Sequence, residues 1–240
     1  RRVSRDQLWV KEFHIWMRGM TAQWMGVTGS HANSVAPLLI STEQGYLKST
    51  FCKSLLPPAL QRYYMDKVDL TSQGHIERRL AEMGLLNLDE FDKYAPTKMP
   101  LLKNLMQMAS LSLCKAYQKN YRSLPRIASF IGTSNRKDLL TGSRRFICVL
   151  VEYPIDCEGI DYAQLYAQLK AEILTGEHYW FTKEEETELQ QSNMTFYRQG
   201  PVEDVLRSCY RAAEKGEGCE LLSSADIFQR LKKINPAAMR

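Results

Sequence analysis

The sequence contains no uninterrupted apolar run of about 18 residues, and that absence excludes a helix long enough to span a membrane. No secretory signal opens the chain. The six cysteines include no CxxC pair, and with the four histidines they complete no zinc-binding spacing. We therefore expect reduced thiols in a cytoplasmic protein that makes no membrane contact.

The composition is typical of a folded globular protein. Of the 240 residues, 44% are hydrophobic and 25% are charged. These values exclude a disordered chain, a collagen-like repeat and a small disulfide-stapled domain. The length allows one large domain, or one core with an appendage. The net charge of +5 is compatible with nucleic-acid binding but does not indicate it by itself.

Short apolar runs alternate with segments of helical periodicity. Continuous apolar strands that alternate with helices are typical of a parallel sheet covered on both faces. We therefore predict an α/β fold with a parallel sheet flanked by helices. The expected strands are residues 37–40, 63–65, 85–88, 127–131 and 146–151, and the expected helices lie before Pro57, at 75–83 and along Leu101, Leu102, Leu105, Met108 and Leu113.

The two ends of the chain lack this alternation. Residues 1–35 carry apolar side chains at three- and four-residue steps, which predicts an N-terminal helical segment. We place the sheet-bearing core at 36–153. Residues 154–240 are expected to form a mainly helical extension, interpreted as an incomplete winged helix that includes a helix at 223–233.

Residues 41–50 follow an apolar strand and open a helix, which is the setting of a phosphate-binding loop. In such a loop a lysine reaches the terminal phosphates and the next hydroxyl binds magnesium, and Lys48 and Ser49 fit these roles. The motif has glycine where Thr42 and Leu47 stand. A capped surface helix is the structural alternative. The predicted nucleotide-binding residues are Gln44, Gly45, Tyr46, Lys48, Ser49 and Thr50.

Polar residues follow two further predicted strands. Asp89 and Glu90 come directly after the strand at 85–88, as in a Walker B motif, where the aspartate supports magnesium and the glutamate activates the attacking water. Asn135 follows the strand at 127–131, where an amide positions that water or the γ-phosphate. The carboxyl ends of parallel strands form the ligand-binding edge of an α/β sheet. The alternatives are acids that begin a loop and a simple turn.

Arg144 and Arg145 lead from a glycine-containing turn into the strand at 146–151. Paired arginines in this position suit an arginine finger, which enters a neighbouring subunit's site, although a solvated basic turn has the same sequence. The order of phosphate loop, Asp-Glu pair, asparagine and arginine pair is that of the ring-forming P-loop ATPases. It predicts a P-loop NTPase fold of the ring-forming (AAA+) kind that binds ATP and Mg²⁺. The expected metal ligands are Ser49 and Asp89, and the expected catalytic residues are Glu90, Asn135, Arg144 and Arg145.

Residues 131–135, followed by residues 141–146, resemble the F-I-G-T-x-N … G-[NS]-R-R-F signature of the virulence-associated protein E family. Residues 87–91 resemble its Walker B motif, and residues 176–180 resemble its region downstream of the core. The resemblance implies a P-loop ATPase related to superfamily 3 helicases, from phages, plasmids or genomic islands. It also implies a replication protein that acts as a homo-oligomeric ring, with a hexamer as one expected size, and that works with a primase domain or partner.

Cations and tyrosines alternate between residues 115 and 122. Cations would follow the phosphates of a nucleic acid while tyrosines offer faces on which bases stack. In helicases related to the family, the region before the strand at 127–131 projects into a central channel. We expect Lys115, Lys119 and Arg122 to bind single-stranded DNA. The alternative is a basic helix end favoured by the helix dipole.

Three functions are compatible with the sequence. The favoured one is an ATP-dependent DNA helicase or replication ATPase. Leu47 in place of a glycine supports a second, a P-loop domain kept as a nucleic-acid-binding or assembly scaffold with little or no ATP hydrolysis. The third is a switch-type ATPase that remodels protein, which would hydrolyse ATP at a rate insensitive to single-stranded DNA.

Overall fold

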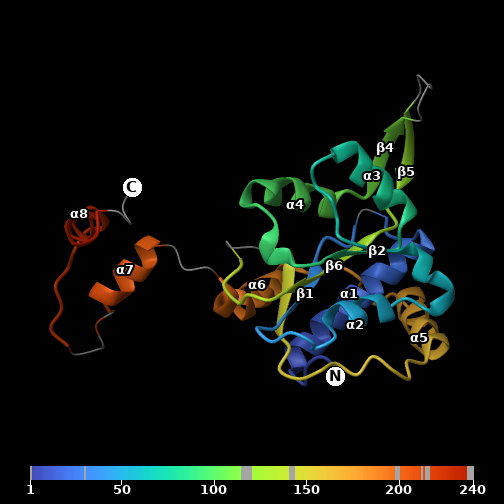
Figure 1. Cartoon of the computed structure of the whole chain (residues 1–240), viewed down its shortest axis with the longest axis horizontal. Helices are drawn as coiled ribbons and strands as arrows, with labels where there is room; N and C mark the ends of the chain where they lie inside the picture. The colour runs from blue at the N-terminus through green and yellow to red at the C-terminus, as the bar shows by residue number, and fades with distance from the viewer. Residues whose placement is uncertain are drawn as a thin grey trace. The chain divides into compact units, whose positions relative to one another are not determined.

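The computed structural model describes residues 2–29, 31–114, 121–140, 144–197, 201–211, 213 and 217–236. The chain divides into two compact units, Arg1–Phe196 and Tyr197–Arg240. The first unit contains the predicted sheet and the residues of the candidate site, and Figure 1 shows its helices and strands.

The first unit is built on a five-stranded parallel sheet with the strand order β2-β3-β6-β1-β7. Three of its strands are buried at every position, as apolar strands covered on both faces must be. The predicted parallel α/β sheet is confirmed, with one strand beginning two residues later than predicted. The strands are β1 (Ala36–Ile40), β2 (Tyr64–Asp66), β3 (Leu85–Leu88), β6 (Ser129–Ser134) and β7 (Phe146–Leu150).

Helices surround this sheet (Figure 1). The longest, α1, runs through the core, where Trp16 and Met20 are fully buried. It ends at Gly26, whose φ of 69° is the left-handed conformation that commonly terminates helices. The α-helices are α1 (Gln7–Met25), α2 (Lys48–Ser54), α3 (Gln73–Glu82), α4 (Met99–Gln107), α5 (Tyr162–Leu174) and α6 (Lys183–Ser192), and the short 3₁₀ helices are η1 (Pro58–Tyr63), η2 (Phe91–Lys93), η3 (Pro96–Lys98) and η4 (Asn193–Phe196).

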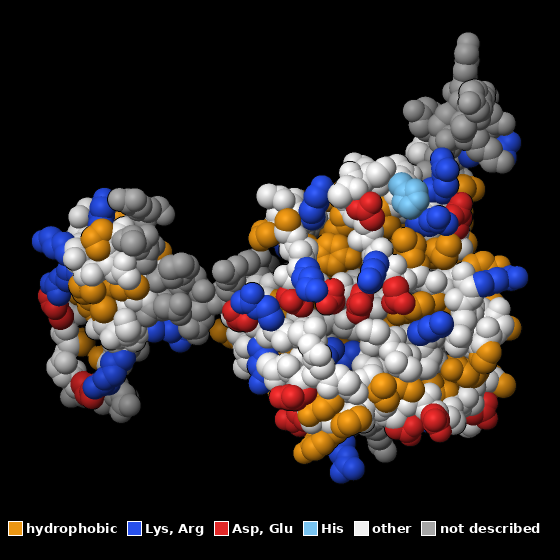
Figure 2. All heavy atoms as spheres, in the orientation of Figure 1, with side chains coloured by type: hydrophobic (Ala, Val, Ile, Leu, Met, Phe, Trp, Pro, Cys, Tyr) orange, Lys and Arg blue, Asp and Glu red, His pale blue; other side chains and the backbone are white. Residues whose placement is uncertain are grey.

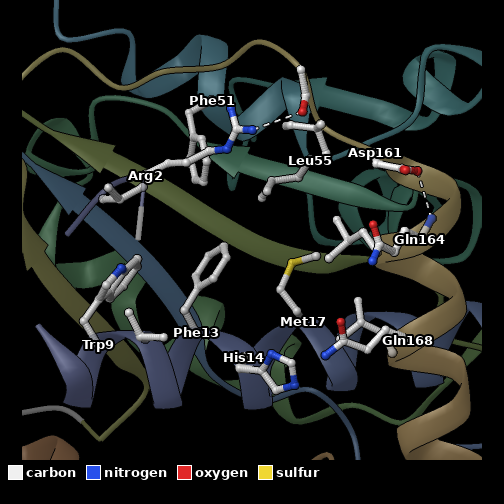
Figure 3. A pocket seen from close by; sticks show the side chains of 16 residues that line it. Arg2, Trp9, Phe13, His14, Met17, Phe51, Leu55, Asp161, Gln164 and Gln168 are labelled. Carbon is white, nitrogen blue, oxygen red and sulfur yellow. Dashed lines mark hydrogen bonds between the residues drawn. The ribbon is translucent and has the colours of Figure 1, made fainter. Parts of the chain in front are cut away.

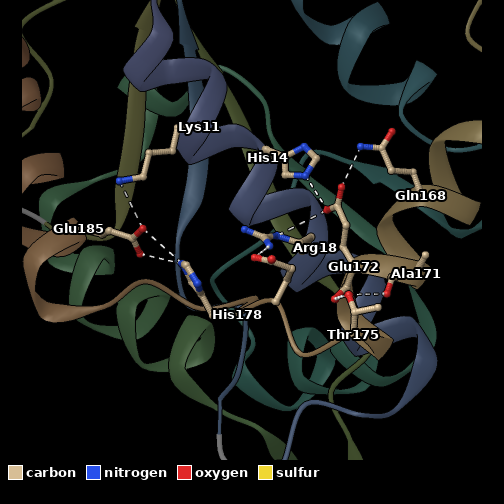
Figure 4. Close-up of polar contacts among 10 residues, drawn as sticks. Lys11, His14, Arg18, Gln168, Ala171, Glu172, Thr175, His178 and Glu185 are labelled. Carbon is tan, nitrogen blue, oxygen red and sulfur yellow. Dashed lines mark hydrogen bonds and ion pairs between the residues drawn. The ribbon is translucent and has the colours of Figure 1, made fainter.

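Polar contacts join α1 to the helices that follow the sheet (Figure 4). His14 Nε2 lies 2.6 Å from Glu172 Oε2 on α5, and Lys11 Nζ lies 3.4 Å from Glu185 Oε1 on α6. Helix α6 also packs against β7. Because α5 and α6 pack on α1 and on the sheet in this way, the first unit continues beyond residue 153, where the sequence predicted a boundary.

A separate antiparallel hairpin, β4 (Ser110–Cys114) and β5 (Tyr121–Pro125), extends from the first unit (Figure 1). The prediction that Met108 and Leu113 continue the helix of α4 was wrong, since α4 ends at Gln107. The physical reason lies in residues 110–113, where serine and leucine alternate with the two-residue period of a strand.

The described part of the second unit contains α7 (Pro201–Cys209) and α8 (Ser224–Ile234). A capping box formed by Ser223 and Asp226 begins α8. The winged helix stays a prediction. Among the described residues, no helix has both the length and the apolar character needed to cross a membrane.

Candidate functional site

The carboxyl ends of three adjacent strands meet at one edge of the sheet. Strand β6 lies between β1 and β3, with Ile40 paired to Ser134 and Leu88 paired to Gly132. Because the three strands are parallel, the segments that follow them leave the sheet at the same edge, which is where open α/β sheets bind ligands. The structure thereby brings together the loop after β1, the acids after β3 and the asparagine after β6.

Lys48 is the first residue of α2, and its side chain reaches the ends of the neighbouring strands. The residue is 9% exposed, and Nζ donates a hydrogen bond to Asn135 Oδ1 at 3.1 Å. Burial lowers the pKa of Lys48 below its ordinary value, and the carboxylates of Asp89 and Asp92 oppose that shift. The site therefore holds an ammonium group whose present partners are a neutral amide and nearby carboxylates, an arrangement suited to receiving an anion.

Asp89 is fixed by hydroxyl groups from two elements. Ser49 Oγ donates to Asp89 Oδ1 at 2.8 Å, and Thr133 Oγ1 donates to the same oxygen at 2.7 Å. Thr133 Oγ1 also accepts the backbone N–H of Glu90 at 3.3 Å. Thr133 was not among the predicted site residues, although its hydroxyl, two residues before Asn135 in the same strand end, was an available signal.

The oxygen atoms of Ser49 and Asp89 suit Mg²⁺, a hard cation that takes oxygen ligands and keeps several water molecules. Within the described residues, no group of three or more His, Cys, Asp or Glu side chains is arranged to hold a metal ion. The Ser49 hydroxyl and the Asp89 carboxylate fit a magnesium ion that takes its other oxygen ligands from water and substrate phosphates.

The loop before α2 has a glycine-like backbone at a residue that is not glycine. Leu47 has φ 59° and ψ 25°, which costs a leucine roughly 1 kcal/mol or more, and the residue is 46% exposed. Gly45 has φ 84°. Tyr46 O accepts the backbone N–H of Ile155 at 3.2 Å, so the segment after β7 supports this loop. Gln44 is exposed on the loop.

Glu90 is held in an ion pair. Its Oε1 lies 2.6 Å from Lys93 Nζ, and its side chain is 42% exposed. Its backbone is left-handed, with φ 52°. The carboxylate follows β3 at the site edge, and Lys93 engages its Oε1.

Asp92 is a third acid of the site, after Asp89 and Glu90, and was not among the predicted site residues. Its Oδ1 accepts Ser134 Oγ at 3.0 Å and the backbone N–H of Asn135 at 3.3 Å. Asp92 thus ties η2 to the end of β6 and holds the peptide group that carries the Asn135 side chain. The only signal in the sequence was its position two residues after the Asp-Glu pair.

Arg144 and Arg145 lie at the amino ends of the strands, opposite to the carboxyl ends that form the candidate site. They precede β7, and Arg145 O accepts the N–H of Ala36 at the start of β1. Arg145 is 8% exposed, and its Nη1 lies 3.5 Å from Ser34 O. Arg144 Nη1 lies 3.1 Å from Glu186 Oε2. The structure does not bring the arginine pair to the candidate site of its own chain.

Of the three predicted DNA-binding residues, the structure describes Arg122, which lies on the hairpin. Lys115 and Lys119 lie outside the described residues, as does the turn at 141–143. Arg122 is exposed on β5, in register with Leu113 of β4. Acidic and basic side chains lie side by side in a band across the visible face of the first unit (Figure 2).

Comparison with known proteins identifies two family models along the chain. The model described as the virulence-associated protein E-like domain matches residues 2–198. A domain of unknown function, described from a B. Theta gene, matches residues 199–240. No curated protein matches.

Solved structures of the C-terminal region of NrS-1 are similar to the chain. The A form apo structure of residues 305–718 is 16% identical, with a TM-score of 0.41 over 78% of this chain and 40% of that one. A second apo structure of the same region has the same identity and TM-score and covers 78% and 41%. The chain thus spans about 40% of the length of these structures.

Proposed function

The chain belongs to the virulence-associated protein E-like family, and on that premise we propose that it is a replication ATPase of a phage, plasmid or genomic island. In this proposal the chain hydrolyses ATP with Mg²⁺, assembles into a ring of like subunits and acts on single-stranded DNA as a helicase. A primase domain or partner works with it.

One observation carries this proposal. The site edge gathers a buried lysine, a hydroxyl–carboxylate pair and an asparagine from three separate segments of sequence, with Lys48 bonded to Asn135 and Ser49 bonded to Asp89. Phosphoryl transfer needs a cation for the β- and γ-phosphates, oxygen ligands for magnesium and a polar group that orients water. A sheet edge built for stability alone has no need of all three.

The residues of the site divide the work of hydrolysis between them. Lys48 binds the β- and γ-phosphates in place of its bond to Asn135. Asn135 is then free to orient the attacking water, and Glu90 accepts its proton once the pair with Lys93 opens. Ser49 and Asp89 hold magnesium, which when bound neutralises the charge that develops on the phosphates.

The arginine pair supports a ring. Arg144 and Arg145 lie at the amino ends of the strands, whereas Lys48 lies at their carboxyl ends. In this proposal the arginines therefore serve phosphoryl transfer in the site of an adjacent subunit and not in their own. A head-to-tail interface that closes on itself places one such edge against the other. In this arrangement Arg144 leaves its ion pair with Glu186 and binds the γ-phosphate in the neighbouring subunit.

Calorimetric titration with Mg-ATP tests the proposal. We expect the chain to bind ATP and Lys48→Ala to weaken binding at least tenfold, because the phosphates lose their cation. Lys53→Ala removes an exposed lysine from the same helix and serves as the control, with binding unchanged. Absence of binding in a folded sample contradicts the proposal.

A nucleic-acid-binding or assembly scaffold is the second candidate, and the bulk of the Leu47 side chain, as distinct from its backbone conformation, favours it. A leucine in the loop adds bulk where phosphate loops have none. The scaffold predicts single-strand binding that neither ATP nor Lys48→Ala changes, measured by fluorescence anisotropy of a labelled oligonucleotide. The ATPase predicts hydrolysis that single-stranded DNA stimulates.

A further inference from the structure

A cavity of about 490 Å³ lies between α1, α2 and α5. Figure 3 shows side chains from the three helices turned toward one another around it. Its walls are mainly aromatic and aliphatic, which is the usual lining of a site for an organic ligand. The apolar side chains that define it are Trp9, Phe13, Met17, Phe51, Leu55 and Leu165.

Two amide side chains stand on the α5 side of this cavity. Gln164 and Gln168 line it one helical turn apart, and Asp161 caps the helix by accepting the Gln164 backbone N–H at 3.0 Å. Gln168 Nε2 donates to Glu172 at 2.8 Å, so the Gln168 amide is already oriented. An amide offers one donor face and one acceptor face, and glutamine pairs in this two-bond manner with adenine.

Helix α2 and the segment after β7 connect the cavity to the loop that we assign to phosphate binding. Phe51, one of its walls, lies one helical turn from Lys48 on α2, a rise of about 4.5 Å. The segment after β7 contacts the loop through the bond from Ile155 N–H to Tyr46 O, and continues to the cavity rim at Gly159. One end of a nucleotide would therefore lie at Lys48 while its other end lies in the cavity.

The aromatic walls define how a flat ring would fit. The ring centroids of Phe13 and Phe51 are 6.1 Å apart with an interplanar angle of 39°, so the two rings already contact each other. A base therefore packs against this pair and does not insert between its members. Arg2 closes the end of the cavity by donating to the carbonyl groups of Asp156 and Glu158.

We propose that this cavity receives the adenine base of the nucleotide whose phosphates bind at Lys48, and that Gln164 determines the base selectivity. The inference rests on the proposed ATPase function. It adds a second contact region, formed by α1 and α5, to a site that the sequence confined to the strand ends. It also gives the residues before β1 a role in nucleotide binding.

The test compares Mg-ATP with Mg-tripolyphosphate, which carries the phosphates without base or sugar. We expect Gln164→Ala to weaken ATP binding about tenfold, as loss of a two-bond contact to a base implies, and to leave tripolyphosphate binding unchanged. Gln164→Trp, which fills the cavity from the exposed side of α5, is expected to weaken ATP binding further. Gln190→Ala makes the same change on α6 and serves as the control.

The outcomes separate this inference from the proposed function. The assignment of the cavity is wrong if the parent chain binds ATP and both Gln164 variants bind it equally well. It is also wrong if the parent chain binds ATP no better than tripolyphosphate. In both cases the ATPase proposal stands. If the folded parent binds neither compound, the proposed function fails and takes the assignment with it. Loss of the preference for ATP over GTP in Gln164→Ala supports the assignment.

Discussion

Replacement of Asp92 by alanine is expected to lower the turnover of ATP about ten- to hundredfold and to leave ATP affinity nearly unchanged. Asp92 Oδ1 accepts the Asn135 backbone N–H and Ser134 Oγ. Without that oxygen the peptide at residue 135 loses its anchor, and the Asn135 amide, to which we assign the orientation of water, moves. A displacement of about 1 Å in a positioning group costs up to about a hundredfold in rate.

The same substitution has a cost in stability that follows from these two bonds. Hydrogen bonds to a charged group contribute roughly 1.5–3 kcal/mol each when they are buried, and Asp92 is only partly buried. We therefore expect a loss of about 2 kcal/mol, or roughly 4–8 °C in the melting temperature of a unit of this size. Turnover is accordingly measured well below the lowered melting temperature.

The assay for Asp92 separates positioning from folding. Steady-state hydrolysis gives kcat and KM, calorimetry gives ATP affinity, and thermal melting gives stability. Asp92→Asn keeps an acceptor oxygen and is expected to recover most of the stability and part of kcat. Asp69→Ala, at an exposed carboxylate bonded to Thr71, is the control. The reasoning is refuted if kcat of Asp92→Ala stays at the parent value, or if ATP affinity falls as far as kcat.

Three further predictions concern other parts of the chain. Arg144→Ala is expected to remove turnover and spare ATP binding, and mixing it with Lys48→Ala subunits restores part of the activity if the arginine acts across an interface. Equal loss of binding and turnover contradicts this. Lys115→Glu with Lys119→Glu is expected to weaken single-strand binding and flatten its salt dependence in anisotropy titrations, and unchanged binding discards the DNA assignment. Burial raises the pKa of Glu12 from 4.5 to about 7. Between pH 4.5 and pH 7 the folded state therefore keeps a proton that the unfolded state has lost, so the free energy of unfolding falls as the pH rises through this range. The fall amounts to no more than about 3 kcal/mol, and Glu12→Gln should remove it. Urea titrations at pH 4.5 and pH 8 measure the free energy of unfolding of both proteins, and an unaltered pH dependence in Glu12→Gln rules out the assignment.

The sheet was predictable because its signal is local. Each strand is a continuous apolar run, and the residues that follow β1, β3 and β6 are polar. The apolar runs therefore indicate the strands, and the polar residues after them indicate the candidate site. The hairpin was not predictable in the same way. Leu111 and Leu113 fall near the spacing that continues α4, and the decisive fact is the pairing of β4 with β5 across residues 115–120.

The part of the site that the sequence did not indicate depends on contacts between distant segments. Asp92 acts on Asn135 only because β6 is inserted between β1 and β3, after a separation of 43 residues in the chain. The cavity likewise requires α1 and α5 to pack together, although α1 precedes the sheet and α5 follows it. Periodicity within one helix gives its apolar face but not the helix that this face meets.

The strained residues of the backbone favour the ATPase over the scaffold. Among the described residues, the left-handed region holds three that are not glycine: Leu47, Lys67 and Glu90. They follow β1, β2 and β3 in turn, at the edge where Lys48 meets Asn135. Such conformations cost of order 1–2 kcal/mol each and persist where the surrounding structure imposes them. Because backbone N–H groups bind the phosphate in phosphate loops, such a loop needs the backbone shape of a glycine at this position more than it needs the glycine itself. A scaffold gains nothing from holding a leucine in that shape, whereas a phosphate loop does.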